Sequence, residues 1–144
     1  MNLRIFTDGG ARGNPGPAAA GWVAKTEKGM VLARGKKYLG ETTNNVAEYQ
    51  ALRLAFSWLL DFAQKKERGK EIKRVDFFLD SRLVVSQVSG LFKIKARHLV
   101  PLISAIKEME RKWGKPVFYH YISREKNREA DMLVNKALDK RSSL

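Results

Sequence analysis

Two aspartates stand where apolar segments of the sequence end. Asp8 closes residues 3–8 (LRIFTD), whose polarity alternates as in a β-strand, and Asp80 closes residues 74–80 (RVDFFLD), an apolar run typical of a buried central strand. In open α/β sheets, ligands bind beyond the carboxyl ends of the strands. If the two strands are neighbours, both carboxylates lie at one end of the sheet, where a ligand would bind.

Two further acids lie on the apolar stripe of a predicted helix. Glu48 precedes Leu52 by one helical turn, and Asp131 precedes Val134 and Leu138 by one and two turns, so each acid shares the core-facing side of its helix. An unpaired carboxylate in that position costs several kcal/mol. For Asp131 alone, a favourable interaction with the helix dipole is a sufficient explanation.

Taken together, these acids predict a cation site. Carboxylates that share a site raise one another's pKa unless cations intervene. Hard oxygen ligands without Cys or His select Mg²⁺ or Mn²⁺. Two such ions, about 3.5–4 Å apart, activate water and stabilise the leaving oxygen in phosphodiester hydrolysis. The predicted chemistry is therefore metal-dependent cleavage of a nucleic acid.

The composition agrees with a polyanionic partner. The 144 residues include 28 Lys and Arg against 15 Asp and Glu, and the resulting net charge of +13 attracts nucleic acid. Hydrophobic residues make up 44% of the chain, enough for a single domain over residues 1–144. The absence of cysteine excludes disulfides and thiol chemistry and favours a reducing, cytoplasmic location. No apolar run approaches the roughly 20 residues of a membrane helix, so no membrane partner is expected.

The elements that position these acids can be predicted from the same sequence. The first three strands form an antiparallel meander, and the glycine-rich segment 9–17 (GGARGNPGP) is expected to be a loop. Asn127 is expected to cap the last helix. The pattern predicts strands at residues 3–8, 21–26, 30–40, 74–80 and 117–123, and helices at 45–66, 81–90, 97–113 and from 127 onward.

Four motifs follow one another along the chain: TDGGARGNPGPAAAG at 7–21, TTNNVAEYQAL at 42–52, LDSRLVVSQ at 79–87 and SREKNREADMLVNKAL at 123–138. Together they resemble type 1 ribonuclease H over essentially the whole chain. The resemblance implies the α/β ribonuclease H-like fold. In that fold a five-stranded mixed sheet, three antiparallel strands and then parallel ones, carries helices on both faces.

The resemblance also implies an activity. The family's enzymes are endonucleases that hydrolyse the RNA strand of RNA/DNA hybrids by two-metal-ion catalysis and leave 5′-phosphate and 3′-hydroxyl ends. Asp8, Glu48, Asp80 and Asp131 match the family's catalytic and metal-binding carboxylates. The implied cofactor is Mg²⁺, with Mn²⁺ as the alternative, at two ions per site. A monomer is expected, and activity on double-stranded RNA is left open.

Residues that match the family's substrate contacts lie in the glycine-rich segment and at the start of the long helix. In the minor groove of a hybrid only the 2′-hydroxyl marks a strand as RNA, so a close backbone approach makes chemical sense. For Asn44 and Asn45, simple helix capping is an equal alternative. The implied substrate-binding residues here are Gly9, Gly10, Ala11, Arg12, Gly13, Asn14, Thr43, Asn44 and Asn45.

The sequence departs from the usual family pattern near the site. Many members carry a His in the loop before the last catalytic Asp, whereas this loop contains Arg124 and Glu125, as in the family's His-less, archaeal-like variants. His120 lies within a predicted strand, where a structural role is expected. Arg82 and Ser86 replace Gln residues that some members place at the hybrid surface.

The family's extra helix and basic handle do not fit into the short segment between Gly90 and Val100. The strip LFKIKAR (91–97) alternates apolar and basic residues instead. We expect Lys93 and Lys95, together with Arg97, to contact phosphates of the DNA strand. Ordinary solvated charges on a connecting loop are the alternative.

Rival functions come from two classes. Integrases, transposases and exonucleases share the fold core and an acidic metal site, and a domain of a reverse transcriptase would carry similar motifs. The TTNN-x-x-E helix start and the compact chain favour ribonuclease H. A nucleic-acid-binding module without catalysis is the alternative from another class, and the presence of all four acids disfavours it.

Overall fold

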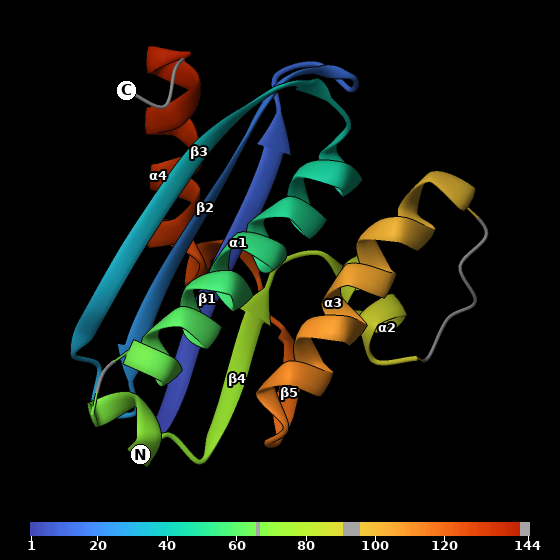
Figure 1. The fold of residues 1–144 in the computed structure, drawn as a ribbon. Helices are drawn as coiled ribbons and strands as arrows, with labels where there is room; N and C mark the ends of the chain where they lie inside the picture. The colour runs from blue at the N-terminus through green and yellow to red at the C-terminus, as the bar shows by residue number, and fades with distance from the viewer. Residues whose placement is uncertain (66, 91–95, 142–144) are drawn as a thin grey trace.

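The computed structural model describes residues 1–65, 67–90 and 96–141, which form one mixed sheet and its helices (Figure 1). The strand order is β3-β2-β1-β4-β5; β1 to β3 are antiparallel, and β4 and β5 run parallel to β1. The predicted five-stranded mixed sheet is therefore confirmed. The elements are β1 (Asn2–Ala11), β2 (Gly16–Thr26), β3 (Val31–Thr42), α1 (Asn44–Lys65), β4 (Arg74–Leu79), α2 (Arg82–Val88), α3 (Val100–Trp113), β5 (Val117–Tyr121) and α4 (Arg128–Lys140), with 3-10 turns at Glu67–Glu71, Arg97–Leu99 and Arg124–Lys126.

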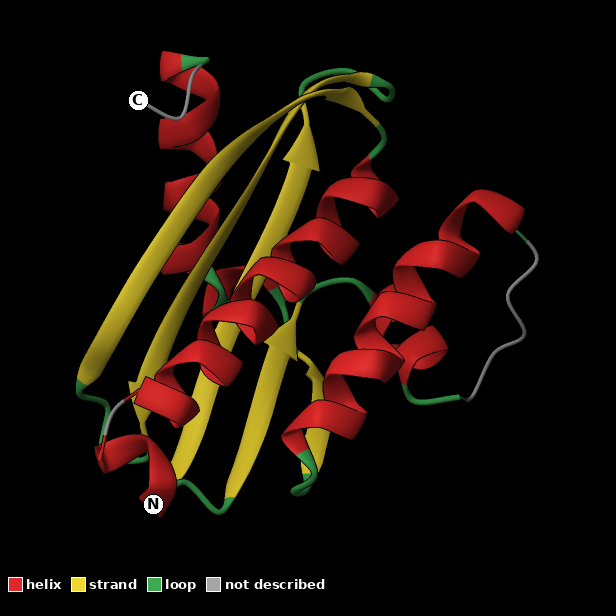
Figure 2. Cartoon of the chain, in the orientation of Figure 1, coloured by secondary structure: helices red, strands yellow, loops and turns green. Residues whose placement is uncertain are grey.

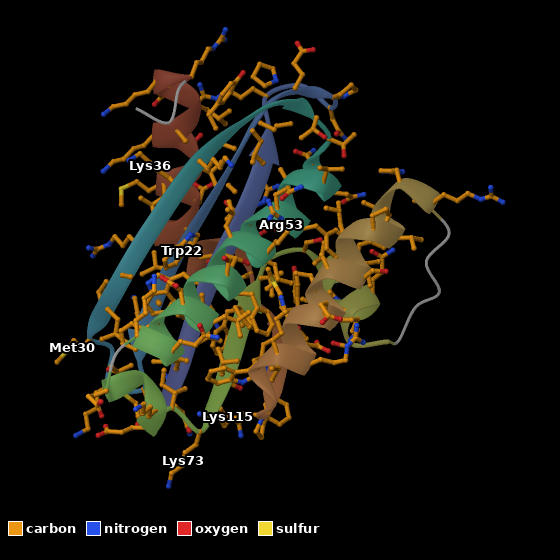
Figure 3. The ribbon with its side chains drawn as sticks, in the orientation of Figure 1. Trp22, Met30, Lys36, Arg53, Lys73 and Lys115 are labelled. Atoms are coloured by element: carbon orange, nitrogen blue, oxygen red, sulfur yellow. The ribbon has the colours of Figure 1, made fainter. Side chains whose placement is uncertain are left out.

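Helices cover both faces of the sheet, as expected. Figure 2 shows α1 and α3 in front of the sheet and α4 behind it. The larger core lies under α1 and α3, where Phe56 of α1 meets Phe77 of β4 with ring centroids 5.1 Å apart. Trp22, labelled in Figure 3, packs from β2 against Trp58 of α1. None of the described helices is long and apolar enough to cross a membrane.

The alternating pattern of β1 translates directly into burial. Leu3 and Ile5 are fully buried in the larger core, while Arg4 between them is exposed on the other side of the sheet. In β4, Val75, Phe77 and Leu79 face the same core. Because parallel pairing joins Thr7 to Leu79, the two residues that follow, Asp8 and Asp80, emerge side by side.

The glycine-rich segment 9–17 is not the continuous loop that its composition predicts. β1 continues to Ala11 and β2 already begins at Gly16, so only residues 12–15 connect the strands. Residues 9–11 pair with Ala18–Ala20 in the antiparallel ladder. Glycine is required there by a neighbouring element and not by a turn, because a Cβ on Gly9 would lie 2.2 Å from the backbone of Ala47 in α1.

Other boundaries differ by smaller amounts. The helix predicted over 97–113 starts as a 3-10 turn at Arg97–Leu99, and α3 begins at Val100, directly before a proline in its first turn. Ser81 caps α2, since its Oγ accepts a hydrogen bond from the Val84 N–H at 3.3 Å. Lys93 and Lys95 lie outside the described residues, so their predicted phosphate contacts stay predictions.

Candidate active site

Three of the four singled-out acids converge at one end of the sheet. Asp8 lies in β1, Asp80 directly follows β4, and Glu48 lies on the first turns of α1. One carboxylate oxygen from each lies within 4.8 Å of those of the other two. Asp131, exposed on the first turn of α4, lines the same cavity. The structure thus brings together four acids from four separate elements.

Backbone contact between elements sets this convergence. Besides the approach of α1 to Gly9, α4 approaches the sheet at Gly21, the residue paired with Asp8 in β2. A Cβ on Gly21 would lie 2.7 Å from the carbonyl oxygen of Ala130. The helices that carry Glu48 and Asp131 are therefore held against opposite faces of the sheet beside Asp8.

The acids line a cavity of about 350 Å³. Its walls also contain the backbone of Gly9, Gly10 and Ala11 and the side chains of several polar residues. Because the cavity joins the end of the sheet to the starts of two helices, its polar groups come from distant parts of the chain. The remaining lining residues are Arg12, Asn44, Asn45, Ser81, Arg124, Val134, Asn135 and Leu138.

Within the described residues, burial and repulsion between neighbouring acids dominate the electrostatics of the cluster. Burial, followed by the negative charge of Asp80, raises the pKa of Asp8 to about 8. Burial and the charges of Asp8 and Asp80 hold the pKa of Glu48 well above its usual range. The Glu48 Oε2 atom is buried and has no hydrogen-bond partner among the residues that the structure describes. An all-oxygen donor set with an unpartnered buried oxygen fits a hard divalent cation.

Asn127 does not play the capping role that its position predicts. It occupies the N-cap of α4, but its side chain makes no capping hydrogen bond. Instead its Nδ2 donates to the Thr7 carbonyl oxygen at 2.8 Å and to Asp80 Oδ2 at 3.2 Å. The side chain is buried because it ties the start of α4 to both acidic strands, so it holds Asp80 in place.

Helix α1 is capped by Thr43 and not by Asn44 or Asn45, whose substrate contacts stay predictions. Thr43 Oγ1 accepts a hydrogen bond from the Val46 N–H at 3.2 Å. Asn44 Oδ1 accepts from the Ala11 N–H at 2.8 Å, and Asn14 Oδ1 accepts from the Asn44 N–H at 3.0 Å. Asn44 and Asn14 thereby join the start of α1 to the β1–β2 connection.

The other predicted contact residues are placed unevenly. Arg12 lines the cavity and also pairs with Asp139 of α4 at 2.7 Å, while Gly13 lies in the connection between β1 and β2. Arg124 lines the cavity, whereas Glu125 lines a smaller neighbouring hollow. Neither of the two α2 residues lines the cavity: Arg82 stacks on Tyr121 at 4.4 Å from the ring centroid, and Ser86 is half-buried.

Sequence reasoning missed Asn135. Its Nδ2 donates to the Asp131 carbonyl oxygen at 3.1 Å and approaches Asp131 Oδ2 at 3.4 Å. The signal was present in the sequence, because a residue four positions after Asp131 on a helix lies on the same side one turn later.

Comparison with known proteins shows which family shares this fold and sequence. A family model described as reverse transcriptase-like matches residues 6–137. LC11-RNase H1, isolated from compost, has been solved in complex with an RNA/DNA hybrid; it is 42% identical to this chain with a TM-score of 0.89, and the match covers 96% of this chain and 98% of that one. The chain belongs to the type 1 ribonuclease H family.

Further relatives of this ribonuclease H chain come from an archaeon and a bacterium. RNase H1 of Halobacterium salinarum is 32% identical with a TM-score of 0.86, over 97% of this chain and 99% of that one. The bifunctional protein of Mycobacterium tuberculosis is 38% identical over 140 residues. The match covers 96% of this chain but only 36% of that relative's length. Family membership favours ribonuclease H over the integrases and transposases considered above.

Proposed function

We propose that this chain is an endonuclease that hydrolyses the RNA strand of RNA/DNA hybrids and leaves 5′-phosphate and 3′-hydroxyl ends. The observation that carries the proposal is the cluster of Asp8, Glu48 and Asp80, with which no cation of the described residues forms an ion pair, in a chain of net charge +13. The solved complex of LC11-RNase H1 with an RNA/DNA hybrid supports the substrate class.

Asp8, Glu48, Asp80 and Asp131 would hold two Mg²⁺ ions, with Mn²⁺ as the alternative. When bound, such ions activate the attacking water and offset the charge on the leaving oxygen. The chain itself supplies fixed ligand positions, because Asn127 holds Asp80. Attack by water on the phosphate requires no covalent bond to the protein.

Recognition of the RNA strand is proposed for the part of the cavity wall that follows Asp8 in β1. Gly9, Gly10 and Ala11 line the cavity, with Gly9 buried and the other two half-buried, and a backbone without bulky side chains can reach a 2′-hydroxyl in the shallow minor groove of a hybrid. Asn45 lines the same wall, and Arg124 offers a guanidinium for the phosphates. Arg82 and Ser86 are proposed to contact the hybrid outside the cavity.

We also propose that the chain acts as a single ribonuclease H domain, as a monomer, in the cytoplasm. The absence of cysteine supports a reducing compartment. All strands of the described chain belong to one sheet, which supports a single folding unit.

A cleavage assay with strand-specific labels tests the proposed function. With Mg²⁺ the RNA strand of a hybrid should be cut, the DNA strand should stay whole, and EDTA should stop the reaction. The same assay on double-stranded RNA, double-stranded DNA and single strands defines the substrate range. A chain that binds the hybrid but leaves its RNA intact in both Mg²⁺ and Mn²⁺ would be a binding module, and the proposal would be wrong.

A further inference from the structure

One face of the sheet is covered by α4 over only part of its width. α4 packs chiefly on β1, β2 and β3. On the strands beyond them, the same face presents Phe78 of β4 together with Phe118 and His120 of β5, as the parallel register places these residues. Phe118 is 43% exposed, and the His120 side chain is 41% exposed. A strip of aromatic surface therefore lies beside the helix that carries Asp131.

The rings on this face form a continuous row. Phe6 of β1 stacks on Phe78 with centroids 4.8 Å apart and ring planes 16° apart, and Phe78 stacks on His120 at 4.9 Å and 23°. The row ends at His120 on β5, which is an edge strand. A flat apolar ring that arrives from outside can extend such a row at its open end.

Cations flank the row. Arg4 is exposed on β1, two residues before Phe6. The Nζ atom of Lys25 lies 5.4 Å from the centroid of the Phe6 ring, and the guanidinium of Arg74 lies over Phe118, 4.2 Å from its ring centroid. The acids nearby are largely neutralised: Asp76 pairs with Arg74 and His120, and Glu129 pairs with Lys25. A hollow of about 480 Å³ is lined by Arg4, Phe78 and His120, together with the acids Glu27 and Asp76.

The row also connects to the active site. Phe6 lines a second, smaller hollow of about 140 Å³, whose walls include Lys126, Asn127 and Arg128. Asn127 is the residue that contacts Asp80. A nucleic-acid strand that leaves the active site towards the aromatic row would cross the start of α4, where Lys126 and Arg128 line this hollow together with Glu125 and Glu129.

We infer that this open face, comprising Arg4, Phe6, Arg74, Phe78, Phe118 and His120, binds unpaired nucleotides that continue from a hybrid held in the active site. Exposed aromatic rings on a sheet, interleaved with arginine, are how proteins bind single-stranded nucleic acid without regard to sequence. Every base offers a flat face to stack, and its phosphate matches the cations. The inference rests on the proposed function only for the hybrid that brings the single strand to the face.

The test compares blunt hybrids with hybrids that carry an unpaired extension of about eight nucleotides, placed in turn on each of the four strand ends. Binding is measured by fluorescence anisotropy in EDTA, so that nothing is cleaved. At least one extension should tighten binding about tenfold, since stacking one or two bases is worth that much. Phe118→Ala and, separately, Arg4→Ala should remove most of this gain and leave the affinity for the blunt hybrid unchanged.

Tyr121→Ala is the matched control. Tyr121 lies on the same strand as Phe118 and is equally exposed at 43%, but it faces the opposite side of the sheet, where Arg82 covers it. This variant should keep the tenfold ratio between extended and blunt hybrids, even if the affinity for both changes.

A free single-stranded oligonucleotide separates this inference from the proposed function. If the wild-type chain fails to bind the blunt hybrid, the proposed function is wrong, and the face is still tested by whether Phe118→Ala weakens binding of the free strand. Equal affinity of the wild-type chain for blunt and extended hybrids would overturn the inference. A gain that survives in both Phe118→Ala and Arg4→Ala would overturn it too, and melting curves of both variants would show that they are folded.

Discussion

Two aspartates on neighbouring strands are equally buried, yet their pKa values are shifted in opposite directions. Asp8 of β1 is 8% exposed and Asp76 of β4 is 9% exposed. Burial raises the pKa of Asp8 to about 8, with the nearby charge of Asp80 adding to it. Burial alone would also raise the pKa of Asp76, but hydrogen bonds from Arg74 and His120 hold it below its usual range.

The difference lies in who supplies the cation. At Asp76 the protein provides it, since Arg74 donates two hydrogen bonds at 2.9 and 2.7 Å and His120 Nε2 lies 2.7 Å away. At Asp8 the neighbouring groups that shift the pKa are other acids, with the charge of Asp80 the largest of them. A buried carboxylate with its own partners is part of the framework, whereas a buried cluster without them is built for a cation from solution.

The largest expected effect separates the two aspartates by activity. Asp8→Asn should lower kcat on an RNA/DNA hybrid by about 10³-fold or more, roughly 4 kcal/mol, while hybrid affinity changes little because the basic surface supplies the attraction. Asp76→Asn should keep kcat within a factor of about two. Single-turnover cleavage and binding in EDTA measure both quantities, and near-wild-type turnover by Asp8→Asn in saturating Mg²⁺ would contradict the site assignment.

The second effect is on stability without metal. Because the folded pKa of Asp8 lies above its unfolded value, the folded chain binds the extra proton, and the free energy of unfolding should fall as pH rises from about 4 towards 8. Asp8→Asn should remove this loss and stabilise the metal-free chain by roughly 2–4 kcal/mol at pH 8.

Urea unfolding in EDTA at pH 5 and pH 8 measures this stabilisation. Millimolar Mn²⁺ should raise the Tm of the wild type at pH 8 and leave that of the double variant Asp8→Asn/Asp80→Asn unchanged. A wild-type Tm that Mn²⁺ does not move would argue against a metal site in this cluster.

Asn127 should matter at the acidic cluster through Asp80. Asn127→Ala removes the Nδ2 donor to Asp80 and leaves the Thr7 carbonyl oxygen unpaired, so kcat should drop about tenfold, roughly 1.4 kcal/mol, with KM unchanged. The Mn²⁺ concentration for half-maximal activity should rise as well. A loss of stability with unchanged metal dependence would mean that Asn127 only supports the fold.

The smallest expected effect is on the stability of the fold, through the ion pair of Asp76. Asp76→Asn should destabilise the fold by about 1 kcal/mol at neutral pH, since Arg74 and His120 are half-exposed and can turn to water. The folded pKa of Asp76 is lowered, so this contribution is present above about pH 4 and is lost as pH falls through the folded pKa. Urea unfolding of wild type and variant at pH 7 and pH 3 measures it, and an equal difference at both pH values would contradict the ion pairs.

The sequence predicts the positions of Asp8, Glu48 and Asp80 because their signals are local. The prediction that Asp131 lies on the core-facing side of its helix is wrong, since Asp131 is exposed on the first turn of α4. Alternation places Asp8 and Asp80 at strand ends, and helical spacing places Glu48 on a buried side. Their meeting needs only the additional assumption that the two strands are neighbours, which the register of β1 and β4 satisfies.

What the sequence could not predict depends on distant partners. Asn127 looks like a cap because it precedes a helix, but its hydrogen-bond partners lie 120 and 47 residues away. Gly9 looks like a loop residue because it lies in a glycine-rich segment. The reason for a glycine at this position is its contact with Ala47 of α1, which the sequence does not reveal. The pairing of Asp76 with His120 joins two strands that a helical segment separates along the chain. The lowered pKa of Asp76 could therefore not be foreseen from the sequence either.

The two glycines beside Asp8, Gly9 and Gly21, also limit how a more heat-resistant version of this protein can be made. Replacing glycine with alanine is a standard stabilising substitution. It lowers the conformational entropy of the unfolded chain and so raises the free energy of unfolding by about 0.4–1 kcal/mol. This substitution is not possible at Gly9 or Gly21. The added methyl group would clash with the backbone of Ala47 at Gly9, or of Ala130 at Gly21, and would push α1 or α4 and its acidic residue away from the sheet. Engineering for temperature must therefore work at the periphery and leave these two crossings untouched.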